Sequence, residues 1–399
     1  MIAVEQALSI ILAHSHQFSC TAIPLKKAVG KVLMEDIYAD RDFPPFDRVT
    51  MDGIAIKYSA YQAGQKDFKI AGVGAAGSPQ IEIEEATTCV EIMTGAMLPR
   101  GADTIVRYED LSIKDGHATI EIDTVKFAQN VHFKGEDRKQ GDLVIAKNRR
   151  LSPAEIGVLA TVGKSLVQVA ELPKTIIIST GDELVEVDEI PKDHQIRKSN
   201  VHRLQASLRA QGFDADTLHL ADDDGVIYQK MEQVLSNYKI ILLSGGVSKG
   251  KFDFIPKVME QLEVEKLFHR IAQRPGKPFW FGKWKDQSLV FAFPGNPVSS
   301  FINMEYYFKS WLNACLDIVP NKRYAALGDD IYFKPNLTYF AQVKLKMSTK
   351  AEMIALPMEG HGSGDLANLT DADAFIILPL GKEIYKKGEV FEILPFKLL

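Results

Sequence analysis

Three short turns, rich in glycine and small polar residues, could bind an anion together with a metal ion. The first spans Leu243–Asp253 and reads Leu-Ser-Gly-Gly-Val-Ser-Lys-Gly-Lys-Phe-Asp, between an apolar strand and a helix. The others span Ser179–Glu183 and Phe293–Ser299. Residues without bulky side chains let backbone N–H groups approach a phosphate or another oxyanion. A carboxylate behind such a loop, here Asp253, can hold a metal ion.

Further carboxylates accompany these turns. Asp182 and Glu183 end the turn at 179–183, and the run Asp222–Asp224 stands at the start of a predicted helix. Because the nine histidines form no HExxH motif or His–Cys cluster, oxygen ligands and therefore hard ions such as Mg2+ are favoured. Asp223 and Asp253 are the candidate ligands. Helix capping explains the run 222–224 equally well.

Two other segments could contact an oxyanion. Arg274 and Lys277 flank a Pro-Gly turn, where Arg can bind an oxyanion as a fork and Lys as a point charge. A solvated charged hairpin is the alternative interpretation. In the turn at 294–299, Asn296 can cap a helix that begins at Pro297. Capping and anion binding use the same N–H groups, so both interpretations of that turn are compatible.

The elements between these turns predict a doubly wound α/β domain over residues 173–318. Segments 175–178 and 239–243 are short aliphatic runs typical of buried parallel strands, and segments 199–212 and 225–237 have helical spacing. A long helix is predicted from about 297 to 315. The carboxyl ends of parallel strands meet at one edge of the sheet, so the three turns should face a common crevice.

The remaining segments predict three further structural parts. Alternation at 80–84 and 118–122 predicts strands of a β-rich insertion domain over 43–135. A helix at 2–14 and a second helix starting at Ser152-Pro153 predict a discontinuous N-terminal linking domain over 1–42 and 136–172. Strand-like runs at 340–345 and 374–378 predict a C-terminal β-barrel domain over 319–399.

The composition excludes several classes of protein. A chain of 399 residues with 46% hydrophobic residues supports more than one core, and a net charge of -5 argues against sequence-independent nucleic-acid binding. Cys20, Cys89 and Cys315 lie far apart, which supports neither a disulfide framework nor a zinc site. Without an apolar run of membrane length or a secretory leader, the sequence predicts a cytoplasmic protein with no membrane or nucleic-acid partner.

Together with two turns of the β-rich region, the motifs follow one another in a fixed order along the chain. They are Pro44–Asp47 leading into Met51–Ala55, then Ile92–Ala96, Ser179–Leu184, Ser244–Ser248, Pro275–Pro278 and Pro294–Ser299. Taken alone, the two β-rich segments are most often simple turns. In this order, the set closely resembles the molybdopterin molybdenumtransferase family, which includes MoeA and the gephyrin E domain. The resemblance covers nearly the whole chain.

This resemblance implies a reaction and an assembly. Molybdate and adenylylated molybdopterin would be converted to the molybdenum cofactor with release of AMP, assisted by Mg2+. The enzyme would be a homodimer whose β-rich domain faces the α/β domain of the other subunit, forming a composite site. Molybdopterin adenylyltransferase and molybdoenzymes would be its possible partners.

The resemblance also implies the site residues. The catalytic residues would be Asp52, Thr94 and Glu183. Substrate would be bound by Ser199, Asn200, Ser244, Gly245, Gly246, Ser248, Arg274, Lys277, Pro294, Gly295, Asn296, Pro297 and Ser299. The metal would be held by Asp223 and Asp253. Asp52 and Glu183 suit the positioning of water, metal or dithiolene sulfurs better than general-base catalysis at an ordinary pKa.

Two other functions are compatible with parts of the sequence. Molybdopterin adenylyltransferases share the α/β domain, but they carry a Gly-Gly-Thr-Gly loop where this chain has Gly245–Ser248, and they lack the β-rich and C-terminal domains. A dimeric scaffold that binds a peptide is the other possibility. A pure scaffold would have no use for the complete set of polar turns, so the metal-inserting enzyme is the preferred hypothesis.

Overall fold

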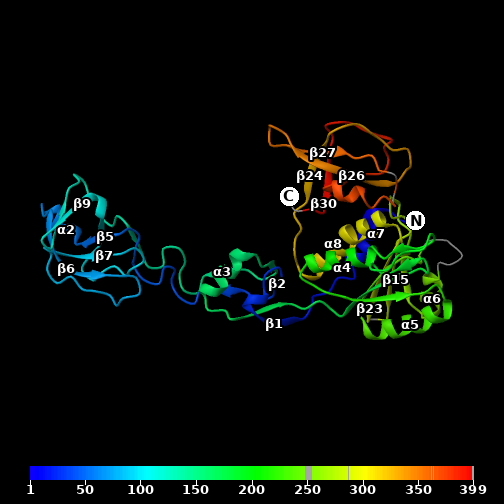
Figure 1. The fold of residues 1–399 in the computed structure, drawn as a ribbon, viewed down its shortest axis with the longest axis horizontal. Helices are drawn as coiled ribbons and strands as arrows, with labels where there is room; N and C mark the ends of the chain where they lie inside the picture. The colour runs from blue at the N-terminus through cyan, green and yellow to red at the C-terminus, as the bar shows by residue number, and fades with distance from the viewer. Residues whose placement is uncertain (248–253, 286, 361, 363, 398–399) are drawn as a thin grey trace. The chain divides into compact units, whose positions relative to one another are not determined.

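The computed structural model describes residues 1–247, 254–285, 287–360, 362 and 364–397. The predicted site residues Ser248 and Asp253 lie outside the described residues. The chain divides into two compact units (Figure 1). The larger unit contains Met1–Met34, Asn148–Ser152 and Val167–Leu399, and the smaller unit contains Glu35–Lys147 and Pro153–Leu166. The four sequence-predicted domain boundaries stay a prediction.

The smaller unit is built around a sheet with the strand order β8-β5-β7-β6-β10-β9. Its strands are β5 (Gly53–Ile56), β6 (Asp67–Gly74), β7 (Thr88–Ile92), β8 (Thr104–Arg107), β9 (Leu111–Lys114) and β10 (His117–Ile120). Neighbouring strands are antiparallel except for β6 and β7. Ile54 and Ile56 join one apolar cluster and Ala55 joins another, so both faces of the sheet are covered.

One predicted strand of this unit is wrong. Segment 80–84 forms only an isolated bridge between Glu82 and Arg100. The alternation is real, since Ile83 is buried in an apolar cluster and Ile81 packs against it. The segment pairs with its neighbour over too few residues to form a strand. Hydrophobic alternation shows that one face is buried, but it does not show how many residues pair with a neighbouring strand.

The larger unit contains the predicted doubly wound α/β domain. Its sheet has the order β18-β15-β19-β23-β22-β20. The strands β15 (Thr175–Thr180), β18 (Asp216–Leu220), β19 (Ile240–Ser244) and β23 (Ser288–Phe293) are parallel, and β22 (Trp280–Trp284) pairs antiparallel with both β23 and β20 (Glu265–His269). The chain runs from β15 outward to β18 and then returns to the other side of β15, which makes β15–β19 a topological switch point.

Helices cover both faces of this sheet (Figure 1). They are α4 (Asn200–Ala210), α5 (Asp224–Asn237), α6 (Ile255–Gln261), α7 (Pro297–Asn303) and α8 (Lys309–Cys315), with a π-helical turn at Met304–Phe308 between the last two. The predicted helix at 297–315 is thereby confirmed. Ile177 and Leu242 pack toward α4, α7 and α8, whereas their neighbours Ile176 and Ile241 pack toward α5 and α6.

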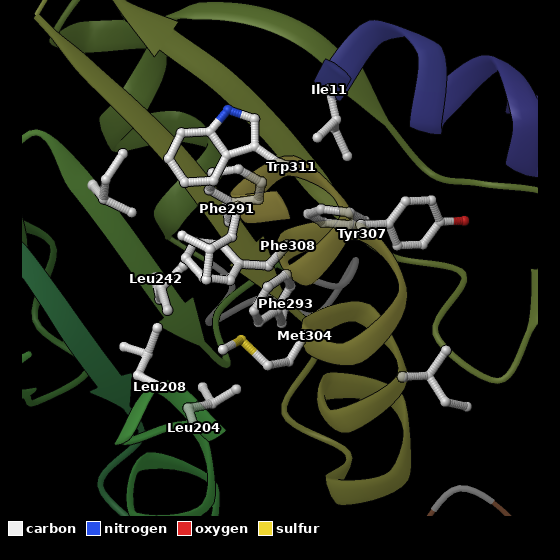
Figure 2. Packing of buried hydrophobic residues seen from close by; sticks show 14 of the residues in the cluster. Ile11, Leu204, Leu208, Leu242, Phe291, Phe293, Met304, Tyr307, Phe308 and Trp311 are labelled. Atoms are coloured by element: carbon white, nitrogen blue, oxygen red, sulfur yellow. The ribbon is translucent and has the colours of Figure 1, made fainter. Parts of the chain in front are cut away.

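Aromatic side chains fill the first of these two cores. Figure 2 shows Phe291 and Phe293 of β23 among Phe308, Trp311 and the aliphatic residues of α4. The ring centroids of Phe291 and Trp311 lie 5.5 Å apart. The N-terminal helix α1 (Val4–Leu12) joins the same cluster, and the Trp311 indole N–H donates to the carbonyl of His14 at 3.1 Å. This dense core holds the strands and α7 in fixed positions.

The last part of the larger unit is a closed β-barrel, as predicted. It is formed by β24 (Arg323–Leu327), β26 (Thr338–Met347), β27 (Met353–Pro357), β28 (Ala374–Leu378) and β30 (Val390–Pro395). Closure follows from the pairing of β26 with both β27 and β28. The short strand β21 (Gln273–Arg274) pairs with β26, so the turn that follows β21 is attached to the barrel.

The other elements are short. One sheet consists of β1 (Cys20–Pro24), β2 (Val32–Leu33), β13 (Arg149–Arg150) and β14 (Leu166–Ala170). In the larger unit, β16 (Leu184–Val185) pairs with β17 (Ile196–Arg197), and β25 (Ile331–Tyr332) pairs with β29 (Ile384–Tyr385). In the smaller unit, β3 (Ile37–Tyr38) pairs with β12 (Leu143–Ile145), and β4 (Arg48–Val49) pairs with β11 (Val131–His132). The remaining helices are α2 (Tyr58–Gln62), α3 (Pro153–Thr161) and α9 (Asn368–Asp371), with 3-10 turns at Leu25–Lys27 and Tyr108–Asp110.

Candidate active site

A cleft of about 550 Å3 lies at the carboxyl ends of β15, β19 and β23. Three turns contribute to it: Gly181 and Glu183 after β15, residues 245–247 after β19 and residues 294–297 after β23. Open parallel sheets bind their ligands at this edge. The predicted site residues that line the cleft are Glu183, Ser199, Asn200, Ser244, Gly245, Gly246, Pro294, Gly295, Asn296 and Pro297.

The turn after β19 requires glycine at two successive positions. Gly245 and Gly246 have φ angles of +108° and +69°. A Cβ on Gly245 would stand 3.0 Å from the carbonyl oxygen of Thr180, and one on Gly246 would stand 2.7 Å from Cγ1 of Ile255. The backbone N–H of Gly245 donates to the carbonyl of Phe293 at 3.1 Å. The turns after β15, β19 and β23 are therefore packed against one another through glycine backbone.

Asn200 connects two of these turns to α4. Its amide nitrogen Nδ2 donates to Oγ of Ser244 at 2.9 Å and to the carbonyl of Gly295 at 2.7 Å. Its Oδ1 accepts a hydrogen bond from Nη2 of Arg203 at 2.8 Å. Asn200 is the first residue of α4, so the start of this helix, the end of β19 and the turn after β23 form one hydrogen-bonded group.

Carboxylates enter the cleft from two turns. Glu183 lines it after β15, and Asp222 lines it after β18. The backbone N–H of Asp222 donates to Oδ1 of Asp182 at 3.0 Å, which joins the two turns. Asp223, the ligand predicted from the sequence, is the N-cap of α5, where its Oδ1 accepts from the N–H of Val226 at 2.9 Å. Asp223 thus acts as a helix cap, its predicted role as a metal ligand stays a prediction, and Asp222 is the carboxylate that lines the cleft.

Three predicted substrate-binding residues that the structure describes are absent from the lining of this cleft. Arg274 and Lys277 are exposed, and the Arg274 guanidinium lies 6.0 Å from the ring centroid of Phe333, beside the barrel. Phe333 in turn stacks on Tyr339 with centroids 4.3 Å apart. Ser299 is buried within α7. Their predicted contact with substrate stays a prediction.

The remaining predicted residues, Asp52 and Thr94, meet in the smaller unit. Antiparallel pairing of β5 with β7 aligns Gly53 with Ile92, so the residues just beyond those positions come together. Asp52 Oδ1 accepts from the Thr94 N–H at 2.6 Å and from the Thr94 hydroxyl at 2.7 Å. The backbone N–H of Thr94, followed by its hydroxyl, lowers the pKa of the exposed Asp52 carboxyl. Asp52 is therefore an anion at neutral pH.

The chemistry of these groups suits anions and hard cations. Glycine turns present backbone N–H groups, and two carboxylates offer the oxygen atoms that Mg2+ prefers. Within the described residues, no group of three or more His, Cys, Asp or Glu side chains could hold a metal ion by protein ligands alone. Mg2+ commonly retains water and binds through one or two carboxylates together with substrate phosphates, so Glu183 and Asp222, which both line the cleft, are the candidate ligands.

Comparison with known proteins identifies the family of this chain. Models of the MoeA N-terminal region (domain I and II), a probable molybdopterin binding domain and the MoeA C-terminal region (domain IV) match residues 2–163, 176–314 and 324–396. A molybdopterin molybdenumtransferase from Synechocystis sp. is 40% identical over 394 residues, which cover 98% of this chain and 99% of that protein. The chain belongs to the MoeA family.

Other relatives agree with this assignment. The molybdopterin molybdenumtransferase of Staphylococcus aureus strain Mu50 is 30% identical over 403 residues, covering 98% of this chain and 95% of the relative. The crystal structure of a molybdopterin biosynthesis MoeA protein from Pyrococcus horikoshii OT3 matches with a TM-score of 0.82 at 27% identity, over 99% of this chain and all of that chain. The predicted family and multidomain MoeA fold are thus confirmed, and the chain is a transferase of molybdenum cofactor biosynthesis.

In the part of the chain that the structure describes, no helix has the length and apolar character needed to cross a bilayer.

Sequence reasoning missed cleft residues that depend on short pairings. Arg197 and Lys198 line the cleft because β17 pairs with β16 in the register Leu184↔Ile196. The Lys198 ammonium binds Oε1 of Glu186 at 2.5 Å, and this hydrogen bond lowers the pKa of Glu186. A two-residue pairing leaves no periodic signal in sequence. Asp222 could have been found from the sequence. If Asp223 is the N-cap of the helix, Asp222 must lie in the turn between the preceding strand and that helix.

Proposed function

We propose that this MoeA-family chain inserts molybdenum from molybdate into molybdopterin, taking adenylylated molybdopterin as its substrate and releasing AMP in a reaction that requires Mg2+. The observation that carries the proposal is the cleft at the switch point, which is lined by glycine turns and two carboxylates. This combination suits a substrate that contains linked phosphates. The relatives' molybdenumtransferase names agree with it.

Each part of the cleft has a role in the proposal. The turns at 245–247 and 294–297 present backbone N–H groups to the phosphates, and the hydroxyl of Ser244 assists them. Glu183 and Asp222 would hold Mg2+, and the bound ion would neutralise the negative charge of the linked phosphates from which AMP is released. Arg197, exposed at the same cleft, attracts the anionic substrates. Molybdate is a substrate here and not a resident metal.

The proposal includes a second subunit. Asp52 and Thr94 form an exposed, hydrogen-bonded pair in the smaller unit, and the residues of the cleft all belong to the larger unit. We propose that the enzyme is a cytoplasmic homodimer in which the Asp52–Thr94 pair of one subunit completes the cleft of the other. Molybdopterin adenylyltransferase would supply the substrate, and molybdoenzymes would accept the product.

Release of AMP tests the proposed reaction. Purified protein is mixed with adenylylated molybdopterin and Mg2+, with and without molybdate, and AMP is measured by chromatography. We expect AMP to appear at a rate that depends on molybdate and to stop when EDTA removes Mg2+. If folded protein releases no AMP in the presence of molybdate, the proposed reaction is wrong. If EDTA left the rate of AMP release unchanged, the Mg2+ requirement would be wrong, but the proposed reaction would stand.

Two neighbouring aspartates separate a metal ligand from a helix cap. Asp222→Asn should lower AMP release and raise the Mg2+ concentration needed for half-maximal rate, because one charged oxygen ligand is lost. Asp223→Ala should lower the free energy of unfolding by about 1 kcal/mol, the usual cost of an N-cap, and leave the Mg2+ dependence unchanged. Urea unfolding and Mg2+ titrations measure both effects. If the Mg2+ dependence changed in Asp223→Ala and not in Asp222→Asn, Asp223 would be the metal ligand.

A further inference from the structure

The Arg203 side chain lies behind the cleft and contacts two of its elements. Its nitrogen Nη2 is 2.8 Å from Oδ1 of Asn200, 2.6 Å from the carbonyl oxygen of Pro297 and 2.8 Å from Oγ of Ser300. The guanidinium carbon lies 5.2 Å from the ring centroid of Phe301. One arginine of α4 is thus bonded to the first residue of its own helix and to the first turn of α7.

The other guanidinium nitrogens of Arg203 show how enclosed this group is. Nε and Nη1 are buried and have no hydrogen-bond partner among the described residues. Desolvation lowers the pKa of Arg203 to about 10, opposed in part by the charge of Glu305. At neutral pH the guanidinium therefore remains protonated and can only donate hydrogen bonds. Burial of a cation costs desolvation free energy, and only hydrogen bonds or opposite charges compensate for that cost.

Donor-only chemistry fixes the Asn200 amide in one orientation. Oδ1 must face Arg203, because the amide NH2 group would meet only donors there. Nδ2 must then face the Ser244 hydroxyl and the Gly295 carbonyl, as the structure has it. The Ser244 oxygen accepts from Nδ2, so the hydroxyl hydrogen of Ser244 is left to donate to another acceptor. This orientation satisfies two neighbours at once, because the Arg203 guanidinium can only donate and the Gly295 carbonyl can only accept.

We propose that Arg203 is a positioning residue: it orients Asn200 so that Ser244 donates its hydroxyl hydrogen to a substrate phosphate while Gly295 stays bound to α4. This inference rests on the proposed function for the identity of the phosphate. The orientation of Asn200 itself does not depend on it. Arg203 does not line the cleft, so it acts through Asn200 without touching the substrate.

Matched substitutions on α4 test this role. Arg203→Met removes all donors at similar length, and Arg203→Lys keeps a cationic donor. We expect Arg203→Met to lower kcat/KM for AMP release by about 10-fold or more, as for a lost charge-assisted contact, and Arg203→Lys to recover most of it. Arg209→Met, on the same helix and paired with exposed Asp214 at 3.2 Å, should match wild type. Equal losses in Arg203→Met and Arg203→Lys would overturn the inference.

A double-mutant cycle with Asn200→Ala distinguishes positioning from general support of the fold. If Arg203 acts through Asn200, Arg203→Met should have little further effect on kcat/KM in the Asn200→Ala background. If the fold-loss in kcat/KM of the double variant equalled the product of the two single fold-losses, Arg203 would not act through Asn200.

A crystal structure of Arg203→Met separates this inference from the proposed reaction. We expect the Asn200 amide to lose its contact with Ser244 or Gly295, and an unchanged amide would overturn the inference. This readout needs no turnover. If wild-type protein released no AMP, the proposed reaction would fail while the crystallographic comparison still decided the role of Arg203.

Discussion

Replacement of Gly245 by alanine is expected to lower kcat/KM for AMP release by about 100-fold, because displacing a catalytic turn by an ångström can cost that much. The φ angle of +108° at Gly245 is one that residues with a side chain rarely adopt. The new Cβ would also stand 2.9 Å from Oγ1 and 3.0 Å from the carbonyl oxygen of Thr180. A backbone carbonyl cannot rotate away, so the whole turn must shift relative to β15 and β23.

Gly388→Ala is the matched control for this prediction. Gly388 also has a positive φ angle, +87°, but a Cβ there would meet no atom within 4 Å. It should lose about 1 kcal/mol of unfolding free energy, the usual penalty of left-handed backbone, and keep full turnover. Thermal unfolding of both variants separates folding from activity. Turnover of Gly245→Ala at the wild-type rate, in folded protein, would mean that this turn does not hold the substrate.

Glu183→Gln is expected to lower kcat for AMP release by about 100- to 1000-fold, the usual range for removal of one electrostatic contact to a reacting group. The substitution keeps the size of the side chain and removes only its charge. Glu183 lies against the backbone of Gly181, where an added Cβ would overlap the carboxylate, so its position is restricted by close packing. A loss of Mg2+ affinity should accompany the loss of rate.

The control for Glu183 is a carboxylate from the next loop, between β16 and β17. Glu189 is exposed and does not line the cleft, so Glu189→Gln should behave as wild type in both kcat and Mg2+ dependence. Kinetics at several Mg2+ concentrations measure the difference. Equal rates for Glu183→Gln and wild type would remove Glu183 from the proposed site.

The sequence predicted the α/β domain and its cleft well for a physical reason. Buried parallel strands are continuous apolar runs, as in β15 and β19, and each is followed directly by its small polar turn. Once the strands are known to be parallel, their turns must meet at one edge. The closed barrel was predictable from strand-like runs, but its pairing order depends on contacts between distant segments.

The contacts that the sequence did not predict belong to residues whose direction depends on tertiary structure. Arg274 belongs to a strand that pairs with the barrel, so its side chain is found beside Phe333. Arg203 reads as an ordinary polar residue of α4, and its importance appears only when α7 is placed beside that helix. Neither contact leaves a periodic pattern in the chain, because each joins segments that are far apart in sequence.

Subunit complementation tests the proposed composite site most directly. Asp52→Ala and Glu183→Gln chains carrying different affinity tags are co-expressed, and the mixed dimer is purified through both tags. Each pure variant should be nearly inactive. The mixed dimer has one site in which both halves are intact, so it should show about half the activity of a wild-type dimer. If each site were instead formed within one chain, both sites of the mixed dimer would carry a defect, and a mixed dimer no more active than the pure variants would contradict the account.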